Sequence, residues 1–185
     1  MRIAFDIDEV ICSVDGELRT WFLDRLGYDI HAGKTFQIAI PGWTESDIWV
    51  EITRFLMCHA DSFNPIEDAI NELPWFYNFN KGPLPFVTAR PPEVKSQTAN
   101  WLKKYVPVPH TLELSNNGSK VKYLKNVDYY VDDRIKNTNE AAPFLLNAFL
   151  LKKRWSAERN SELLPNVVPV TNLLEVKEFI MEQEV

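Results

Sequence analysis

Short apolar runs alternate with amphipathic stretches along this chain, most regularly after residue 80. A short continuous apolar run is typical of a strand buried in a parallel sheet, whereas apolar residues three and four positions apart are typical of a helix. Strands are predicted at 2–6, 84–88, 111–114, 128–132 and 147–151. Helices are predicted at 92–105, 119–125, 136–145 and 171–183. Strands that alternate with helices predict βαβ units and therefore an α/β fold with a parallel sheet.

The first two predicted strands are separated by a long segment that is helical and aromatic. Helices are predicted there at 16–27, 45–60 and 65–73. Two apolar stripes support the first two helices: Leu18, Trp21, Phe22 and Leu26, and then Ile48, Ile52, Phe55 and Leu56. Both stripes indicate helix packing rather than a ligand site. One helical insertion therefore interrupts the strands of the sheet in sequence.

Carboxylates follow two of the predicted strands. Asp6 and Asp8 lie at the end of the first strand, and Asp132 and Asp133 at the end of a later one. Ligands bind outside the carboxyl ends of the strands in open α/β sheets, so these acids are expected at a binding edge. The spacing of Asp6 and Asp8 puts both side chains on one side of an extended chain. Such a set of oxygen ligands is typical of a Mg²⁺ site that handles phosphate.

The segment Asp6-x-Asp8-x-Val10 resembles the first motif of the haloacid-dehalogenase-like (HAD) phosphohydrolases. Three further stretches resemble the family's other motifs in the right order. They are Pro85-Phe86-Val87-Thr88-Ala89-Arg90, Gly118-Ser119-Lys120 and Tyr129-Tyr130-Val131-Asp132-Asp133-Arg134. Each stretch alone is common in turns and at helix ends. The ordered set of four is far more specific.

This resemblance implies a fold and a division into domains. The expected fold is α/β, a Rossmann-like three-layer parallel sheet with a small helical cap inserted after the first strand. The core domain would comprise residues 1–13 and 81–185, and the cap residues 14–80. A cap of this kind excludes water and selects the substrate, while the sheet carries the chemistry.

The resemblance also implies roles for the acids. Asp6 is expected to be the nucleophile that attacks phosphorus, and Asp8 to protonate the leaving alcohol and later deprotonate water. Mg²⁺ is the expected cofactor, held by Asp6, by the main-chain carbonyl of Asp8 and by one acid of the pair Asp132-Asp133. Both acids of the pair are metal candidates, because the sequence leaves open which one contacts the ion directly.

Four further residues are expected to bind the substrate. Thr88 and Lys120 would stabilise the phosphoryl oxygens by a hydrogen bond and a positive charge. Ala89 and Arg90 follow Thr88 in the same motif; Arg90 could contact a phosphate or sugar, or pair with a nearby carboxylate. Lys122 is the alternative to Lys120, which is preferred because it falls in the first turn of the predicted helix.

One residue departs from a common form of the family. Glu9 stands in the first motif where many members have glycine. It adds charge to the loop and could shift the turn. Both reactive aspartates are nevertheless intact.

The short cap and the Thr-Ala-Arg and Asp-Asp-Arg motifs most resemble the 5'(3')-deoxyribonucleotidase branch of the family. A nucleobase could stack on aromatic residues of the cap, which could equally be packing residues. The candidates are Trp43, Trp49, Trp75 and Phe76. The run Lys152-Lys153-Arg154-Trp155 resembles a family segment at the rim of the site, or is a solvated face.

Composition narrows the possible partners. The 185 residues, 45% of them hydrophobic, suffice for one sizeable core, and the net charge of −6 argues against binding a nucleic-acid polymer. The two cysteines, Cys12 and Cys58, give no disulfide framework, and no leader or long apolar span is present. We expect a cytoplasmic protein with a small phosphorylated substrate and no membrane partner. The sequence does not indicate an oligomeric state.

The expected function is that of a Mg²⁺-dependent phosphomonoesterase that works through an aspartyl-phosphate, with a (deoxy)nucleoside monophosphate as substrate. One alternative is a phosphatase of another small phosphorylated metabolite. A second is a catalytically silent phosphate- or nucleotide-binding module, which would need only some of the reacting groups. Dehalogenation is disfavoured, because the additional acids suit Mg²⁺ and phosphate better than a carbon centre.

Overall fold

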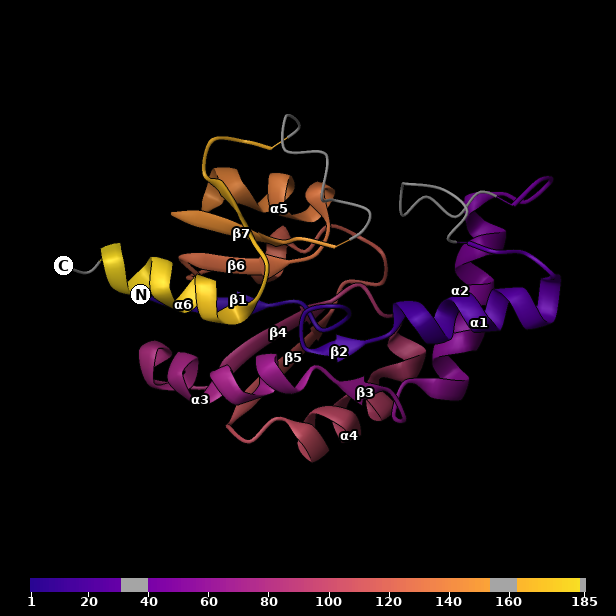
Figure 1. The fold of residues 1–185 in the computed structure, drawn as a ribbon, viewed down its shortest axis with the longest axis horizontal. Helices are drawn as coiled ribbons and strands as arrows, with labels where there is room; N and C mark the ends of the chain where they lie inside the picture. Colours follow the sequence, from indigo (N-terminus) through magenta and orange to yellow (C-terminus); the bar gives the residue numbers. More distant parts are fainter. Residues whose placement is uncertain (31–39, 154–162, 184–185) are drawn as a thin grey trace.

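Six parallel strands form one sheet in the order β5-β4-β1-β6-β7-β8 (Figure 1). The structure is a computed structural model and describes residues 1–30, 40–153 and 163–183. The strands are β1 (Ile3–Phe5), β4 (Leu84–Thr88), β5 (His110–Leu114), β6 (Tyr129–Asp132), β7 (Asn147–Leu151) and β8 (Val167–Val170). Helices flank the sheet on both faces, so the predicted α/β fold with a Rossmann-like, three-layer parallel sheet is confirmed.

The α-helices occupy most of the predicted helical segments, although several of their ends differ. The α-helices are α1 (Asp15–Leu26), α2 (Glu45–His59), α3 (Glu67–Asn80), α4 (Lys95–Tyr105), α5 (Ile135–Ala141) and α6 (Leu173–Gln183). The described residues also form short 3₁₀ turns, namely η1 (Pro92–Val94), η2 (Val121–Tyr123) and η3 (Ala142–Phe144). Within the described part of the chain, no helix combines the length and apolar character that a membrane crossing requires.

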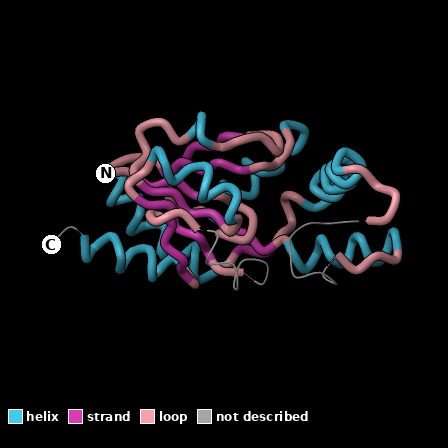
Figure 2. Tube along the Cα trace, turned by 90° about the horizontal axis from the view of Figure 1, so that it is seen from above, coloured by secondary structure: helices cyan, strands magenta, loops and turns pink. Residues whose placement is uncertain are grey.

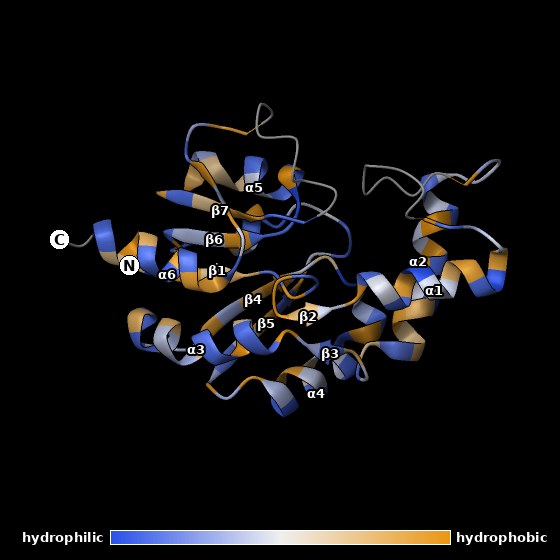
Figure 3. Cartoon of the chain, in the orientation of Figure 1, coloured by the Kyte–Doolittle hydropathy of each residue, from blue (hydrophilic) through white to orange (hydrophobic). Residues whose placement is uncertain are grey.

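The hydrophobic core lies on both faces of the sheet, because alternate residues of a strand point to opposite sides. On one face Phe5 packs edge-on against Phe76 of α3, with ring centroids 5.1 Å apart. On the other, Ala4 and Tyr130 form a cluster with Ala141 of α5. All three residues of β1 are buried, and the strand is hydrophobic throughout (Figure 3). Burial on both faces is what the short apolar runs predict.

The strand β1 lies at the point where the strand order reverses. The chain passes from β1 to β4 and β5 on one side, and then crosses to β6, β7 and β8 on the other. In α/β sheets the crevice at such a reversal is the usual ligand site. The loop that follows β1, beginning at Asp6, is therefore central to the binding edge.

The helices α1 and α2 extend away from the sheet to one side, as two views at right angles show (Figures 1 and 2). A two-stranded antiparallel pair, β2 (Cys12–Ser13) and β3 (Asn64–Pro65), joins the start and the end of this segment. The sequence did not predict this pair, because strands of two residues leave no periodic signal. The segment thus leaves and re-enters the core at one place.

The helix α3 differs from its prediction, since it continues to Asn80 instead of ending at residue 73. The helix contains Pro74 in its interior, where proline removes a helix hydrogen bond. Packing outweighs this cost: Phe76 contacts the sheet, and the buried Asn80 amide exchanges hydrogen bonds with both main-chain groups of Ile3, at 2.8 and 3.0 Å. Although α3 falls within the predicted cap range of 14–80, it lies on the sheet; the domain borders stay a prediction.

Two other elements differ from the sequence prediction. The helix predicted at 119–125 is only the 3₁₀ turn η2. The edge strand β8 was not predicted; its Pro169 indicates a loop, but proline is tolerated on an edge strand because that edge needs no donor. Neither difference moves the carboxyl ends of β1, β4 and β6.

Candidate functional site

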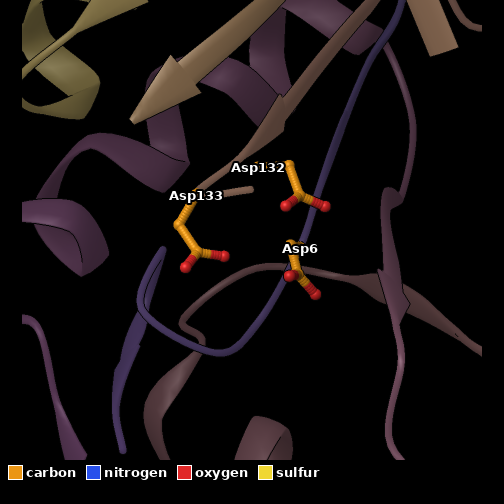
Figure 4. Close-up of side chains that lie close together, drawn as sticks. All are labelled: Asp6, Asp132 and Asp133. Carbon is orange, nitrogen blue, oxygen red and sulfur yellow. The ribbon is translucent and has the colours of Figure 1, made fainter. Parts of the chain in front are cut away.

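Three aspartates meet beyond the carboxyl ends of neighbouring strands (Figure 4). Asp6 follows β1, Asp132 ends β6, and Asp133 follows it. One carboxylate oxygen from each lies within 4.8 Å of those of the other two, and all three residues are buried. Parallel pairing of Phe5 with Val131 brings the two strand ends side by side. Residues 126 positions apart in sequence thus form one acidic cluster.

Lys120 is the cation that faces this cluster. Its ammonium nitrogen lies 2.8 Å from Asp6 Oδ2 and 2.8 Å from Asp132 Oδ2. The side chain is almost fully buried, whereas Lys122 is exposed and lies over the ring of Tyr123. Of the two candidate lysines, the structure brings only Lys120 to the acids, although the helix expected to present it is absent.

Asp132 is the most heavily hydrogen-bonded acid of the site. Besides Lys120, it accepts hydrogen bonds from the Tyr130 hydroxyl at 2.5 Å and from the main-chain N–H of Arg134 at 2.8 Å. The Asn137 amide donates to both of its oxygens, at 3.0 and 3.1 Å. These donors fix the carboxylate in one orientation. Asn137 was not predicted; the available signal was an amide in the first turn of the helix after the acidic pair.

Burial and mutual repulsion favour the protonated forms of two acids. Burial raises the pKa of Asp6 to about 7; attraction to Lys120 opposes this shift, and repulsion by Asp132 and Asp8 adds to it. Burial and the charge of Asp132 raise the pKa of Asp133 well above its ordinary range. The charges of Arg134 and Lys120 lower the pKa of Asp133, but burial and the charge of Asp132 outweigh them. A hard cation bound by oxygen ligands fits this donor set, and Mg²⁺ is such a cation.

Asp8 is not part of the three-aspartate cluster and pairs with Arg90. The guanidinium donates from Nη2 to Asp8 Oδ1 at 2.6 Å and from Nε to both carboxylate oxygens, at 3.1 and 3.2 Å. Arg90 is buried, whereas 30% of the Asp8 side chain is exposed. Of the two interactions left open for Arg90, pairing with a carboxylate is present in the structure.

The loop after β4 is braced by the loop after β5. Thr88 is fully buried, and its hydroxyl accepts the main-chain N–H of Arg90 at 3.2 Å. The carbonyl of Thr88 accepts the N–H of Ser115 at 2.8 Å, and that of Ala89 accepts the N–H of Asn117 at 2.9 Å. Asn117 adopts a left-handed backbone conformation, with φ of 57°. These contacts hold the predicted phosphate-binding loop next to Asp6.

Glu9 takes over the conformation of the expected glycine. Its φ is 61°, a left-handed value that is unfavourable for a residue with a Cβ. Its carboxylate accepts the N–H groups of Val14 and Asp15, at 2.6 and 2.8 Å, and thereby caps the start of α1. The second carboxylate oxygen lies 3.7 Å from Lys153 Nζ. Glu9 therefore ties the first motif to α1 and to the end of β7.

A cavity of about 90 Å³ opens at this end of the sheet. Its polar lining includes Asp6, Asp8, Arg90, Asp133 and Arg134. Its opposite wall is apolar and comes from α1 and α2 and the residue before α1: Val14, Leu18, Trp49, Ile52, Phe55 and Leu56. A charged edge therefore faces a hydrophobic wall across a space that holds several water molecules or a phosphate group.

The four aromatic residues considered for stacking on a base lie in different places. Trp49 lines the cavity, whereas Trp43 is not among the described residues that do so. Trp75 stacks on Phe79, with centroids 5.4 Å apart, and Phe76 packs on the sheet. Of the predicted basic run at the rim, Lys153 lies near Glu9, while Arg154 and Trp155 lie outside the described residues.

No family model matches the chain, and no curated protein matches it significantly.

Proposed function

We propose that this protein is a phosphomonoesterase that uses Mg²⁺ and forms an aspartyl-phosphate on Asp6. The observation that carries the proposal is the buried cluster of three carboxylates around one ammonium group at the reversal point of the sheet. Buried like charges at this density are costly unless a cation and an anionic substrate compensate them. The four motifs supply the order of residues that this chemistry needs.

The metal would be held by Asp6 and by the pair Asp132 and Asp133, with the main-chain carbonyl of Asp8 as a further ligand. Bound Mg²⁺ supplies positive charge that polarises the phosphoryl group and offsets the charge that develops during transfer. Asp132 is already oriented by Tyr130 and Asn137, which suits a residue that anchors a metal site.

In the first step Asp6 attacks phosphorus, the bond from phosphorus to the leaving oxygen breaks, and Asp8 gives its proton to that oxygen. In the second step Asp8 takes a proton from water, the water oxygen attacks phosphorus, and the bond to Asp6 breaks. Inorganic phosphate and free Asp6 result. Lys120 and the Thr88 hydroxyl stabilise the phosphoryl oxygens in both steps.

The apolar wall supports a nucleoside monophosphate as substrate. Trp49 and the neighbouring side chains present a hydrophobic surface opposite the acids, where a flat base can pack. A small sugar phosphate would leave this surface in contact with water. The nucleotidase assignment within the phosphatase class therefore rests on Trp49 and its neighbours.

The test is phosphate release from a panel of deoxynucleoside and ribonucleoside monophosphates, sugar phosphates and p-nitrophenyl phosphate, with Mg²⁺ and with chelator. We expect release that requires the metal and is fastest for nucleotides. Asp6→Asn should abolish it, whereas Asp29→Asn, at an exposed ion pair with Arg19, should not. Folded wild-type protein that binds Mg²⁺ but releases no phosphate would favour a silent binding module. Full activity in Asp6→Asn would contradict the proposed nucleophile.

A further inference from the structure

Every donor of Arg90 has a partner within the protein. Its Nε and one N–H of Nη2 are directed to Asp8. The second N–H of Nη2 faces Cys12 Sγ at 3.6 Å. The two N–H groups of Nη1 are directed to Thr98 Oγ1, at 3.1 Å, and to the Ala60 carbonyl, at 3.4 Å. A guanidinium has five donors, so none is left for a substrate phosphate.

The surroundings of Arg90 hold the guanidinium in a single position. Its exposed fraction is 1%, and its plane lies over the ring of Phe63, 5.4 Å from the centroid. Thr98 belongs to α4, and Ala60 directly follows α2. Burial would lower the pKa of Arg90, but attraction to Asp8 outweighs it, so the pKa is raised and the charge is kept. Arg90 is thus anchored on the core and on the end of the α1–α2 segment.

The contact with Asp8 is asymmetric. Oδ1 accepts two N–H groups, at 2.6 and 3.1 Å, whereas Oδ2 has the single longer contact of 3.2 Å. Oδ2 is therefore the oxygen that Arg90 holds less tightly. Asp8 and Arg90 both border the cavity, but Arg90 is 1% exposed, whereas the Asp8 side chain is 30% exposed. Arg90 therefore fixes the orientation of the group and leaves one oxygen available.

We propose that Arg90 is a positioning residue that aims Asp8 Oδ2 at the leaving oxygen and, in the next step, at water. It acts through Asp8 and does not contact the substrate. This inference rests on the proposed function, because it assigns a proton-transfer role to Asp8. Hydrolysis of the aspartyl-phosphate is common to all substrates, so the selective effect is expected in kcat/KM, which reports the first step. Loss of Arg90 should lower kcat/KM mainly for substrates whose leaving group needs a proton.

The test compares two substrates of similar size. Benzyl phosphate releases an alkoxide that must be protonated, whereas p-nitrophenyl phosphate releases a stable anion. We expect Arg90→Lys to lower kcat/KM for benzyl phosphate by about 100-fold or more, the usual size of general-acid catalysis, and for p-nitrophenyl phosphate by less than about 5-fold. Asp8→Asn should give the same pattern. The double variant should show no further loss, because both changes remove one function.

Because Arg90 is buried, a second variant keeps the proposal testable if Arg90→Lys does not fold. Thr98→Val removes one Nη1 acceptor and keeps both charges, so we expect a smaller loss, again confined to benzyl phosphate. The control is Arg54→Lys at a mostly exposed guanidinium that pairs with Glu51; it should affect neither substrate.

The positioning role would be overturned if folded Arg90→Lys and Thr98→Val lost kcat/KM equally on both substrates while Asp8→Asn lost it selectively on benzyl phosphate. A rise confined to KM in Arg90→Lys would overturn it in favour of direct substrate binding. The proposed function would fail in a different way: wild-type protein would release no phosphate in a metal-dependent manner, and the positioning role would fall with it.

Discussion

The ammonium nitrogen of Lys120 lies 2.8 Å from the carboxylate of Asp6, and both groups are buried. The same nitrogen contacts Asp132, so a single cation serves two acids. Attraction to these acids outweighs the effect of burial and raises the pKa of Lys120, which stays charged. The stability of the metal-free protein therefore depends on this residue.

Replacing Lys120 tests that dependence. We expect Lys120→Met to lower the free energy of unfolding at pH 8 in chelator by about 3–5 kcal/mol, because it removes the ammonium group that pairs with two buried carboxylates. Lys122→Met, at the exposed neighbour, should change it by less than about 0.5 kcal/mol. Urea unfolding measures both values. Similar small losses in the two variants would show that the ion pairs do not stabilise the site.

The raised pKa of Asp6 predicts how stability depends on pH. An aspartate with an ordinary pKa of 3.8 is deprotonated in the unfolded chain above pH 4, whereas Asp6 in the metal-free folded protein holds its proton up to a pKa of about 7. The contribution of Asp6 to the free energy of unfolding is full below pH 3.8 and is lost as the pH rises through 7, by up to about 1.4 kcal/mol per pH unit.

Thermal unfolding between pH 4 and 8 in chelator measures this loss. Asp6→Asn should have a shallower profile, because it lacks the titrating group. Mg²⁺ should also flatten the wild-type profile, since a bound cation favours the carboxylate form. Identical profiles for the wild type and Asp6→Asn would contradict the pKa of about 7.

The capping role of Glu9 can be separated from its charge. Glu9→Ala removes the acceptor for the N–H groups of Val14 and Asp15 but keeps a Cβ in the left-handed conformation. We expect it to destabilise the protein by about 1–2 kcal/mol, as the loss of a helix cap does. Glu9→Gln also loses the charge opposite Lys153 but keeps an acceptor oxygen, so it should cost less. Urea unfolding measures the stability of the two variants. Equal losses of stability would mean that the charge of Glu9, rather than its capping of α1, stabilises the protein.

Trp49 tests the role of the apolar wall. We expect Trp49→Ala to lower kcat/KM for a nucleoside monophosphate by about 5- to 100-fold, the loss of one stacking contact, and to have little effect on ribose 5-phosphate. Trp43→Ala removes a tryptophan that is not among the described lining residues and should preserve the preference. Steady-state kinetics on both substrates measure it. An unchanged ratio in Trp49→Ala would remove the support for a base at this wall.

The sequence predicted the sheet well because its signals are local. A buried strand of a parallel sheet is a short apolar run, so β1, β4, β6 and β7 could be located within one or two residues. Asp6 and Asp132 mark the ends of two such runs. Their meeting follows from the parallel arrangement.

Other features depend on contacts between distant residues. Lys120 was preferred over Lys122 on the assumption of a helix, but its position is set by Asp6 and Asp132 rather than by helix phase. Arg90 and Asp8 are 82 positions apart in the sequence. No local pattern shows which of the chain's carboxylates pairs with Arg90. The end of α3 is held on the sheet by Asn80, whose side-chain amide hydrogen-bonds to the N–H and the carbonyl of Ile3 as a neighbouring strand would.

The apolar wall of the cavity is encoded in one stretch of chain, from Val14 to Leu56, whereas the groups proposed to react lie before it and after it. Substitutions within that stretch can reshape what the cavity admits without displacing a single carboxylate. Evolution can therefore alter the choice of substrate and the reaction itself independently, and exchange of this one segment between related chains would transfer recognition as a unit.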